Sequence, residues 1–118
     1  MSFAMTTQQV RARTKTVTRR VGWKDLPRRT WVQPVVKGQG LKRGESVEKI
    51  GGPIRIVNIR RERLDALLED ETYGRAEVIA EGFPDMTPAE FLAMFCQHND
   101  CKPSTRVTRI EFEYTETK

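Results

Sequence analysis

The sequence predicts one α+β domain, a small mixed barrel or curled sheet of five or so strands with short helices. Its 118 residues are enough for a single domain with one modest core, which we place at 1–118. Short β-branched or alternating segments, separated by Gly and Pro, are typical of strands. One segment, beginning at Thr87, carries a full set of helix-start signals.

The N-terminal part is predicted to form a short helix, a basic strand and an edge strand. Thr6 and Gln9 have the spacing of a capping box, which predicts a helix over about 7–13. The β-branched residues of 14–18 are expected to end that helix and to begin a strand. Residues 22–29 indicate a loop or a helical turn. A second strand is predicted over 31–37, where a proline at position 34 requires a sheet edge or a bulge.

A basic, glycine-rich segment, KGQGLKRGE, occupies 37–45. It lacks the GK[ST] ending of a phosphate-binding P-loop, so we interpret it as a turn between strands. A short strand is predicted over 47–50.

The next segments are expected to alternate between strand and helix. The apolar alternation of 54–61 predicts a strand, and its slip at 56–57 suggests a bulge or two buried faces. Residues 64–68 suit one or two helical turns, and 75–81 suit another short helix or an irregular segment. Near the C-terminus, apolar and charged residues alternate over 110–114, which predicts a half-buried strand.

The clearest local signal is the helix start at Thr87. Thr87 suits the N-cap, Pro88 suits the first helical position, and Glu90 completes a capping box. Met86 can pack on Phe91 as a hydrophobic staple. The helix is expected to run to about residue 98. Its apolar stripe consists of Phe91, Leu92, Met94 and Phe95.

Charge is unevenly distributed along the chain. The net charge is +5, but residues 1–61 carry a balance of +12 and residues 62–118 a balance of −7. This asymmetry favours a polyanion-facing surface built from the first half of the chain. The alternative is that the two halves neutralise each other within the fold.

Several classes of protein are disfavoured by composition. No apolar run is long enough for a membrane span, and the N-terminus lacks the apolar core of a secretory signal. Two cysteines do not make a disulfide framework, so a reducing cytoplasm is the expected compartment. Cys96, His98 and Cys101 lie close in sequence, but zinc needs four ligands, or three plus water. We therefore predict no metal and no cofactor.

The candidate chemistry falls to Lys, Thr and Glu, because a chain with one His disfavours a Ser–His or Cys–His pair. A lysine that is desolvated or lies beside other cations loses its proton more readily, and it can then activate a threonine hydroxyl. Lys15 and Thr18 are the candidates, with Arg13, Arg19 and Arg20 nearby in sequence. The alternative is that they belong to a solvated strand face.

The segment RTKTVTRR, residues 13–20, resembles the motif of ASCH domains, which share the PUA-like β-barrel. That motif has a Gly, a Lys two residues on, a Glu three after that, and an Arg two further. Lys15 and Arg20 match it, whereas Arg13 replaces the Gly and Thr18 replaces the Glu. The chain is also similar over nearly its full length to small bacteriophage ASCH proteins, through its opening residues, EGFP and VTRIEFEY.

The resemblance implies a PUA-like barrel of about five to six strands, in the host cytoplasm if the chain comes from a phage. The threonine at position 18 is similar to the ASCH branch with amidohydrolase activity on 4-acetylcytidine, which uses a Lys, a Thr and a Glu. Lys15 and Thr18 stand at the matching positions, and the nearest match for the third residue is Glu81 in AEGFPDM.

Strict strand alternation would put Lys15 and Thr18 on opposite faces. The family glycine position implies that Lys15 lies in the turn before the strand. Thr16, Thr18 and Arg20 then share one strand face, and Lys15 bends over it.

Two main functions are expected. A binding module would hold RNA, another single-stranded nucleic acid or a modified nucleoside in a basic cleft, helped by Trp23 or by Trp31, although we favour Trp31 as a core or barrel-lid residue. The expected ligand contacts are Arg11, Arg13, Thr16, Arg19, Arg20, Trp23, Lys42 and Arg43. A hydrolase would use Lys15 as base, Thr18 as nucleophile or binding group, and Glu81 as proton relay. Ribonuclease action and a purely structural or partner-binding role are further alternatives.

Overall fold

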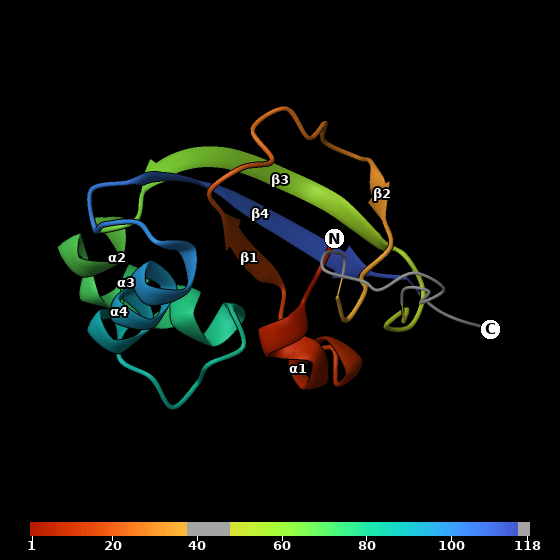
Figure 1. Cartoon of the computed structure of the whole chain (residues 1–118), viewed down its shortest axis with the longest axis horizontal. Coiled ribbons are helices and arrows are strands. Elements are labelled where there is room, and N and C mark those ends of the chain that lie inside the picture. The colour runs from red at the N-terminus through yellow and green to blue at the C-terminus, as the bar shows by residue number, and fades with distance from the viewer. Residues whose placement is uncertain (38–47, 116–118) are drawn as a thin grey trace.

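A computed structural model describes residues 1–37 and 48–115, which form an α+β domain. Four antiparallel strands make a curled, half-barrel sheet in the order β1-β4-β3-β2 (Figure 1). The mixed α+β class is confirmed, but within 1–37 and 48–115 the sheet has four strands rather than the predicted five or six. The strands are β1 Val17–Arg20, β2 Trp31–Val32, β3 Ile54–Arg63 and β4 Arg106–Tyr114.

The predicted helix at 7–13 is shorter than expected, and its capping box is absent. A 3₁₀ turn at Ala4–Thr6 leads into α1, Thr7–Arg11, and the side chain of Thr6 makes no cap hydrogen bond. Gln9 instead donates from Nε2 to the backbone oxygen of Gly82, 3.2 Å away. A contact with a residue far along the chain has replaced the local one.

The predicted start of the first strand at 14 is wrong, because residues 14–16 bond to other elements. The backbone N–H of Thr14 donates to the oxygen of Gln9 at 2.9 Å, and that of Thr16 donates to the oxygen of Ala80 at 2.8 Å. The sheet ladder therefore begins at Val17. This leaves Lys15 in the connection before the strand, as the prediction required.

The strand predicted over 31–37 is also shorter, because β2 ends at Val32. Val35 continues only as isolated bridges to Ser2 and Lys49. That bridge at Lys49 is all that the described residues show of the strand predicted over 47–50. Pro34 lies beyond the end of β2, and β2 itself is an edge strand because it pairs with β3 alone. Most of the basic turn predicted at 37–45 lies outside the described residues.

The slip in alternation at 56–57 is a bulge in the ladder between β3 and β4. Ile56 faces Phe112, whereas Asn58 faces Glu111, so Val57 is the extra residue. The predicted bulge is therefore confirmed, and both strands run longer than expected.

Three helices gather at one end of the sheet (Figure 1). They are α2 Ala66–Glu69, α3 Glu71–Ala80 and α4 Pro88–Asn99. The predicted cap of α4 is confirmed, since the Glu90 N–H donates to Thr87 Oγ1 at 3.1 Å and the Thr87 N–H donates to Glu90 Oε1 at 2.9 Å. Among the described residues, none of the helices has the length and apolar character needed to cross a bilayer.

Two apolar clusters form the interior. One lies under the sheet, and the other lies between α2, α3, α4 and the ends of the long strands. The sheet cluster contains Phe3, Val10, Ile50, Ile54, Ile56, Ile110 and Phe112. The helical cluster contains Leu64, Leu67, Val78, Phe91, Leu92, Phe95 and Val107.

We expect Phe95→Ala to lower the free energy of unfolding by about 3 kcal/mol, near the lower end for a buried ring. The ring packs on Phe91, with centroids 6.1 Å apart. One side of the ring already borders a cavity, so fewer packing contacts are lost when it is removed. Urea unfolding of wild type and variant measures the difference. An unchanged midpoint would contradict the placement of α4 on the core.

Candidate functional site

A cavity of about 230 Å³ lies between the N-terminal segment, β1 and α4, and we call it the first cavity. One of its walls is polar and carries Lys15, Thr18, Arg20 and Glu81. Apolar side chains also line the cavity, namely those of Phe83, Phe91, Met94 and Phe95. This volume is below the roughly 300–1,000 Å³ of sites for drug-sized ligands, so it suits a group the size of one heterocyclic ring.

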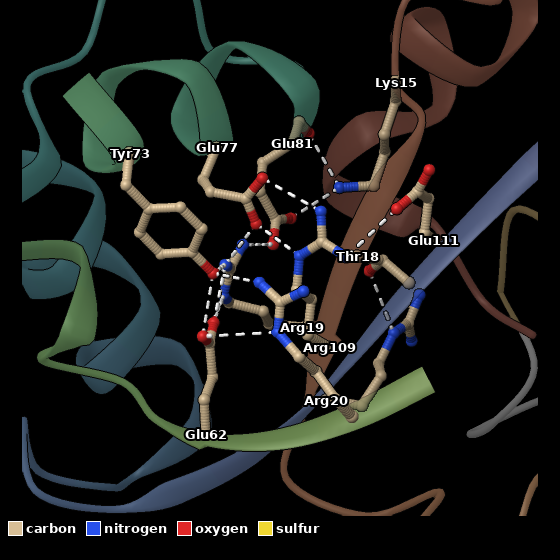
Figure 2. Close-up of polar contacts among 11 residues, drawn as sticks. Lys15, Thr18, Arg19, Arg20, Glu62, Tyr73, Glu77, Glu81, Arg109 and Glu111 are labelled. Carbon is tan, nitrogen blue, oxygen red and sulfur yellow. Dashed lines mark hydrogen bonds and ion pairs between the residues drawn. The ribbon is translucent and has the colours of Figure 1, made fainter. Parts of the chain in front are cut away.

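Lys15 is a deeply buried cation of this cavity. Its side chain is 3% exposed, and Nζ donates to both Glu81 Oε1, at 2.8 Å, and the Glu81 backbone oxygen, at 2.7 Å (Figure 2). A lysine ammonium has three N–H donors. Two are therefore used within the protein, and the third position on nitrogen is left for a ligand in the cavity.

The pKa of Lys15 is lowered, chiefly by burial. The charge and hydrogen bond of Glu81 act in the opposite direction, and the charges of Arg20 and Arg19 reinforce the lowering. The contacting carboxylate, that of Glu81, is shared with a second cation, so it does not offset the effect of desolvation on the pKa of Lys15. The pKa shift has the direction expected for a desolvated lysine, and the close ion pair with Glu81 fixes the position of the amine.

Arg19 connects this pair to a buried ionic cluster (Figure 2). Its side chain is 0% exposed and lies 3.1 Å from Glu81 Oε2, 2.7 Å from Glu62 Oε1 and 2.5 Å from Glu77 Oε1. Arg109 donates to both oxygens of Glu77. Burial alone would lower the pKa of Arg19, but the three carboxylates outweigh it and raise that pKa.

Two carboxylates of the cluster, those of Glu77 and Glu81, are positioned by α3 and its C-terminal end. Glu77 and Glu81 are four residues apart, so they lie on one face of the helix. Gly82 ends the helix at φ 102, and a Cβ there would lie 2.9 Å from Gln9 Cγ. Glycine is thus required directly after Glu81, both for the backbone angle and for the close approach of α1.

Thr18 and Arg20 complete the polar wall. They lie two residues apart on β1, so they share a strand face, and Arg20 Nε donates to Thr18 Oγ1 at 3.3 Å. The Arg20 guanidinium also donates to the Ser2 backbone oxygen at 2.6 Å and lies over the ring of Phe3. The Thr18 oxygen therefore accepts from Arg20, and its own proton is free to face the cavity.

The structure brings together Lys15, Thr18, Arg19, Arg20 and Glu81 around the first cavity but places other predicted contacts elsewhere. Arg19, predicted as a ligand-binding cation, borders this cavity, but its guanidinium is paired with carboxylates of the second half of the chain. The prediction of one cationic surface is wrong at this residue, because charge is compensated internally there. Thr16 is exposed and does not border the cavity.

The remaining predicted contacts lie elsewhere. Arg11 and Arg13 line a second cavity, and Trp23 is exposed without bordering either one. Trp31, favoured as a core or lid residue, is 56% exposed, so that prediction is wrong. The predicted contacts Lys42 and Arg43 lie outside the described residues.

Sequence reasoning missed Glu62, Glu77, Tyr73 and Arg109. Tyr73 donates to Glu62 Oε2 at 2.8 Å and so belongs to the cluster. One usable signal was the spacing of Glu77 and Glu81, which places two carboxylates on one face of the predicted helix. Arg109 directly precedes the apolar Ile110 in an alternating strand, and nothing local marks it as buried.

Cys96 and Cys101 have their sulfur atoms 3.9 Å apart, and both are free thiols. Across the described part of the chain, no three side chains of His, Cys, Asp or Glu gather in a way that could hold a metal ion.

Comparison of the chain with protein-family models, with curated proteins and with solved structures found no match.

Proposed function

We propose that this domain binds a nucleobase, in RNA or as a modified nucleoside, within the first cavity. The observation that carries the proposal is the pairing of a hydrogen-bonding wall, Lys15 and Thr18, with a wall of aromatic side chains. Enclosed bases are recognised in this way, through polar contacts at the edge of the ring and apolar contacts on its faces.

Lys15 is suited to reading a base edge because its orientation is fixed. Glu81 holds the amine through two oxygens, so the third position on nitrogen has a defined direction. The Thr18 hydroxyl adds a group that both donates and accepts. A carbonyl oxygen and a neighbouring ring nitrogen would together match this pair.

The backbone at Arg13 supports the resemblance to ASCH domains. Arg13 has φ 61, in the left-handed region that glycine adopts most readily. It stands where the ASCH motif has its glycine. A turn of this shape carries the chain from α1 to Lys15 and allows the lysine to reach Glu81.

A second candidate function, hydrolysis of an acylated base, is favoured by the lowered pKa of Lys15. The neutral amine would take a proton from the Thr18 hydroxyl or from a water, whose oxygen then bonds to the amide carbon. The C–N bond breaks, and the proton returns through Lys15 and Glu81 to the leaving amine. When Thr18 attacks, water subsequently releases the acid from the ester.

We expect Thr18→Val to weaken binding of cytidine or 4-acetylcytidine about 3- to 10-fold, as the loss of one neutral hydrogen bond predicts. Titration calorimetry with each nucleoside measures the change. Thr16→Val is the matched control, because it is the same substitution at an exposed position of the same segment.

Equal affinity of wild type and Thr18→Val would show that the base does not enter this cavity. Acetate release from 4-acetylcytidine, assayed with the same proteins, tests the hydrolase. A wild type that binds neither nucleoside nor single-stranded RNA would overturn the proposed function.

A further inference from the structure

A second cavity, of about 160 Å³, is bordered by the C-terminal end of α1. Its walls come from the end of α1 and the turn after it, from the turn before β3, and from the end of β4. Its lining residues include Val10, Arg11, Arg13, Gly51, Gly52 and Tyr114. The two cavities share no lining residue, so this one has its own chemistry.

The charged groups that line the second cavity are both arginines. Arg11 pairs with Glu48 at 2.8 Å, on the exposed surface. Arg13 makes no ion pair with any residue in 1–37 or 48–115, and its guanidinium lies over the Tyr114 ring, 5.7 Å from the centroid. A guanidinium has five N–H donors in a planar fork that matches two oxygens of a phosphate.

The backbone around the cavity is held in unusual conformations. Arg13 and Gly51 both have left-handed φ angles, 61 and 62. For an arginine this conformation is unfavourable, and such residues concentrate at functional sites. Within the described chain, no acceptor takes the backbone N–H of Gly51 or Gly52, and both residues line the cavity.

The second cavity is tied directly to Lys15. The Tyr114 hydroxyl, beneath the Arg13 guanidinium, donates to the Lys15 backbone oxygen at 2.5 Å. Arg13 and Lys15 are two residues apart, so their Cα atoms are separated by at most about 7.6 Å. The two cavities are therefore bordered by neighbouring positions of one segment, so a chain of linked nucleotides could contact both.

We propose that the second cavity binds a phosphate group of a single-stranded RNA whose base occupies the first cavity. This inference rests on the proposed function, and it names the ligand as a nucleotide chain rather than a free nucleoside. Arg13 supplies the bidentate contact, and Arg11 and the turn at Gly51–Gly52 supply further donors.

The test compares cytidine, cytidine 5′-monophosphate, inorganic phosphate and a short cytidine-rich RNA by titration calorimetry. Arg13→Gln should weaken RNA binding about tenfold and leave cytidine binding unchanged, because only the phosphate contact is lost. The slope of log affinity against log salt concentration should also fall by about one for RNA binding, because one phosphate contact is lost. Arg29→Gln is the matched control, since Arg29 is exposed and also has φ 62.

Arg13→Gly separates binding from folding, because glycine accepts the left-handed backbone. It should be at least as stable as wild type in thermal unfolding and still lose RNA affinity. If cytidine binds but RNA binds no better in wild type than in Arg13→Gln, the phosphate site is wrong and the proposed function stands. Binding of inorganic phosphate that depends on Arg13 without any gain for RNA would assign the cavity to a free anion and overturn the inference.

Discussion

Replacing Lys15 with Met should weaken ligand binding in the first cavity by about 10- to 150-fold, the range for losing a hydrogen bond from a charged group. Met has nearly the length of Lys, so the side chain still fills its buried position. Glu81 keeps Arg19 as a partner at 3.1 Å, which prevents an unpaired buried carboxylate. Calorimetric titration with cytidine, 4-acetylcytidine and single-stranded RNA measures the loss.

Lys24→Met is the control for charge, because Lys24 is an exposed lysine in the loop between β1 and β2. It removes the same charge without touching either cavity. Equal losses in the two variants would show that binding depends on overall charge and that the position of Lys15 is irrelevant.

The pH dependence distinguishes binding from hydrolysis. Burial lowers the pKa of Lys15, although Glu81 opposes the shift. If the ammonium donates to the ligand, affinity should fall as the pH rises through this lowered pKa. If the neutral amine acts as a base, acetate release should rise over the same interval. Lys15→Met should show neither dependence.

Replacing Arg19 with Ala should lower the free energy of unfolding by about 3–5 kcal/mol, the cost of breaking a buried ion pair from one side. The change leaves Glu62, Glu77 and Glu81 close together without the cation they share. Urea unfolding at neutral pH measures the difference. Arg55→Ala is the control, because Arg55 pairs with Glu113 on the exposed surface and should matter little.

The difference in unfolding free energy between wild type and Arg19→Ala should become smaller in acid. Burial would raise the pKa of Glu77, but hydrogen bonds from Arg109 and from Arg19, together with their charges, outweigh it and hold that pKa below its ordinary value of 4.5. The carboxylate therefore stabilises the fold above about pH 4.5, and this contribution is lost as the pH falls through the lower folded value. The stabilities of wild type and Arg19→Ala should converge there. A difference that does not change with pH would mean that lost packing, and not charge, explains the effect.

Features set by neighbouring residues were predictable from the sequence. The α4 cap depends on Thr87 and Glu90, three positions apart, and both of its hydrogen bonds form. The bulge at 56–57 was visible in the strand's own alternation. At Thr6 and Gln9 the same reasoning failed, because the Thr6 N–H donates to the Phe3 backbone oxygen and the Gln9 side chain binds Gly82 instead.

The convergence of Lys15, Thr18 and Glu81 in space was expected from the resemblance, whereas their roles stay predictions. What could not be predicted was the fate of Arg19. Its neighbours in sequence are mostly cations and threonines, which is why composition groups it with a basic surface. Its carboxylate partners come from β3 and α3, far away in the sequence. A pairing between segments more than 40 residues apart leaves no local trace.

The position of Glu81 at the end of α3 restricts which length changes the domain tolerates. Each residue inserted into a helix turns everything beyond it by about 100°. One insertion within α3 would rotate Glu81 relative to Glu77 or move both away from Lys15 and Arg19, and it would displace Gly82 from Gln9. Insertions in the loop between β1 and β2 do not change this rotational phase. Divergent versions of this domain should therefore vary in that loop while the length of α3 stays constant.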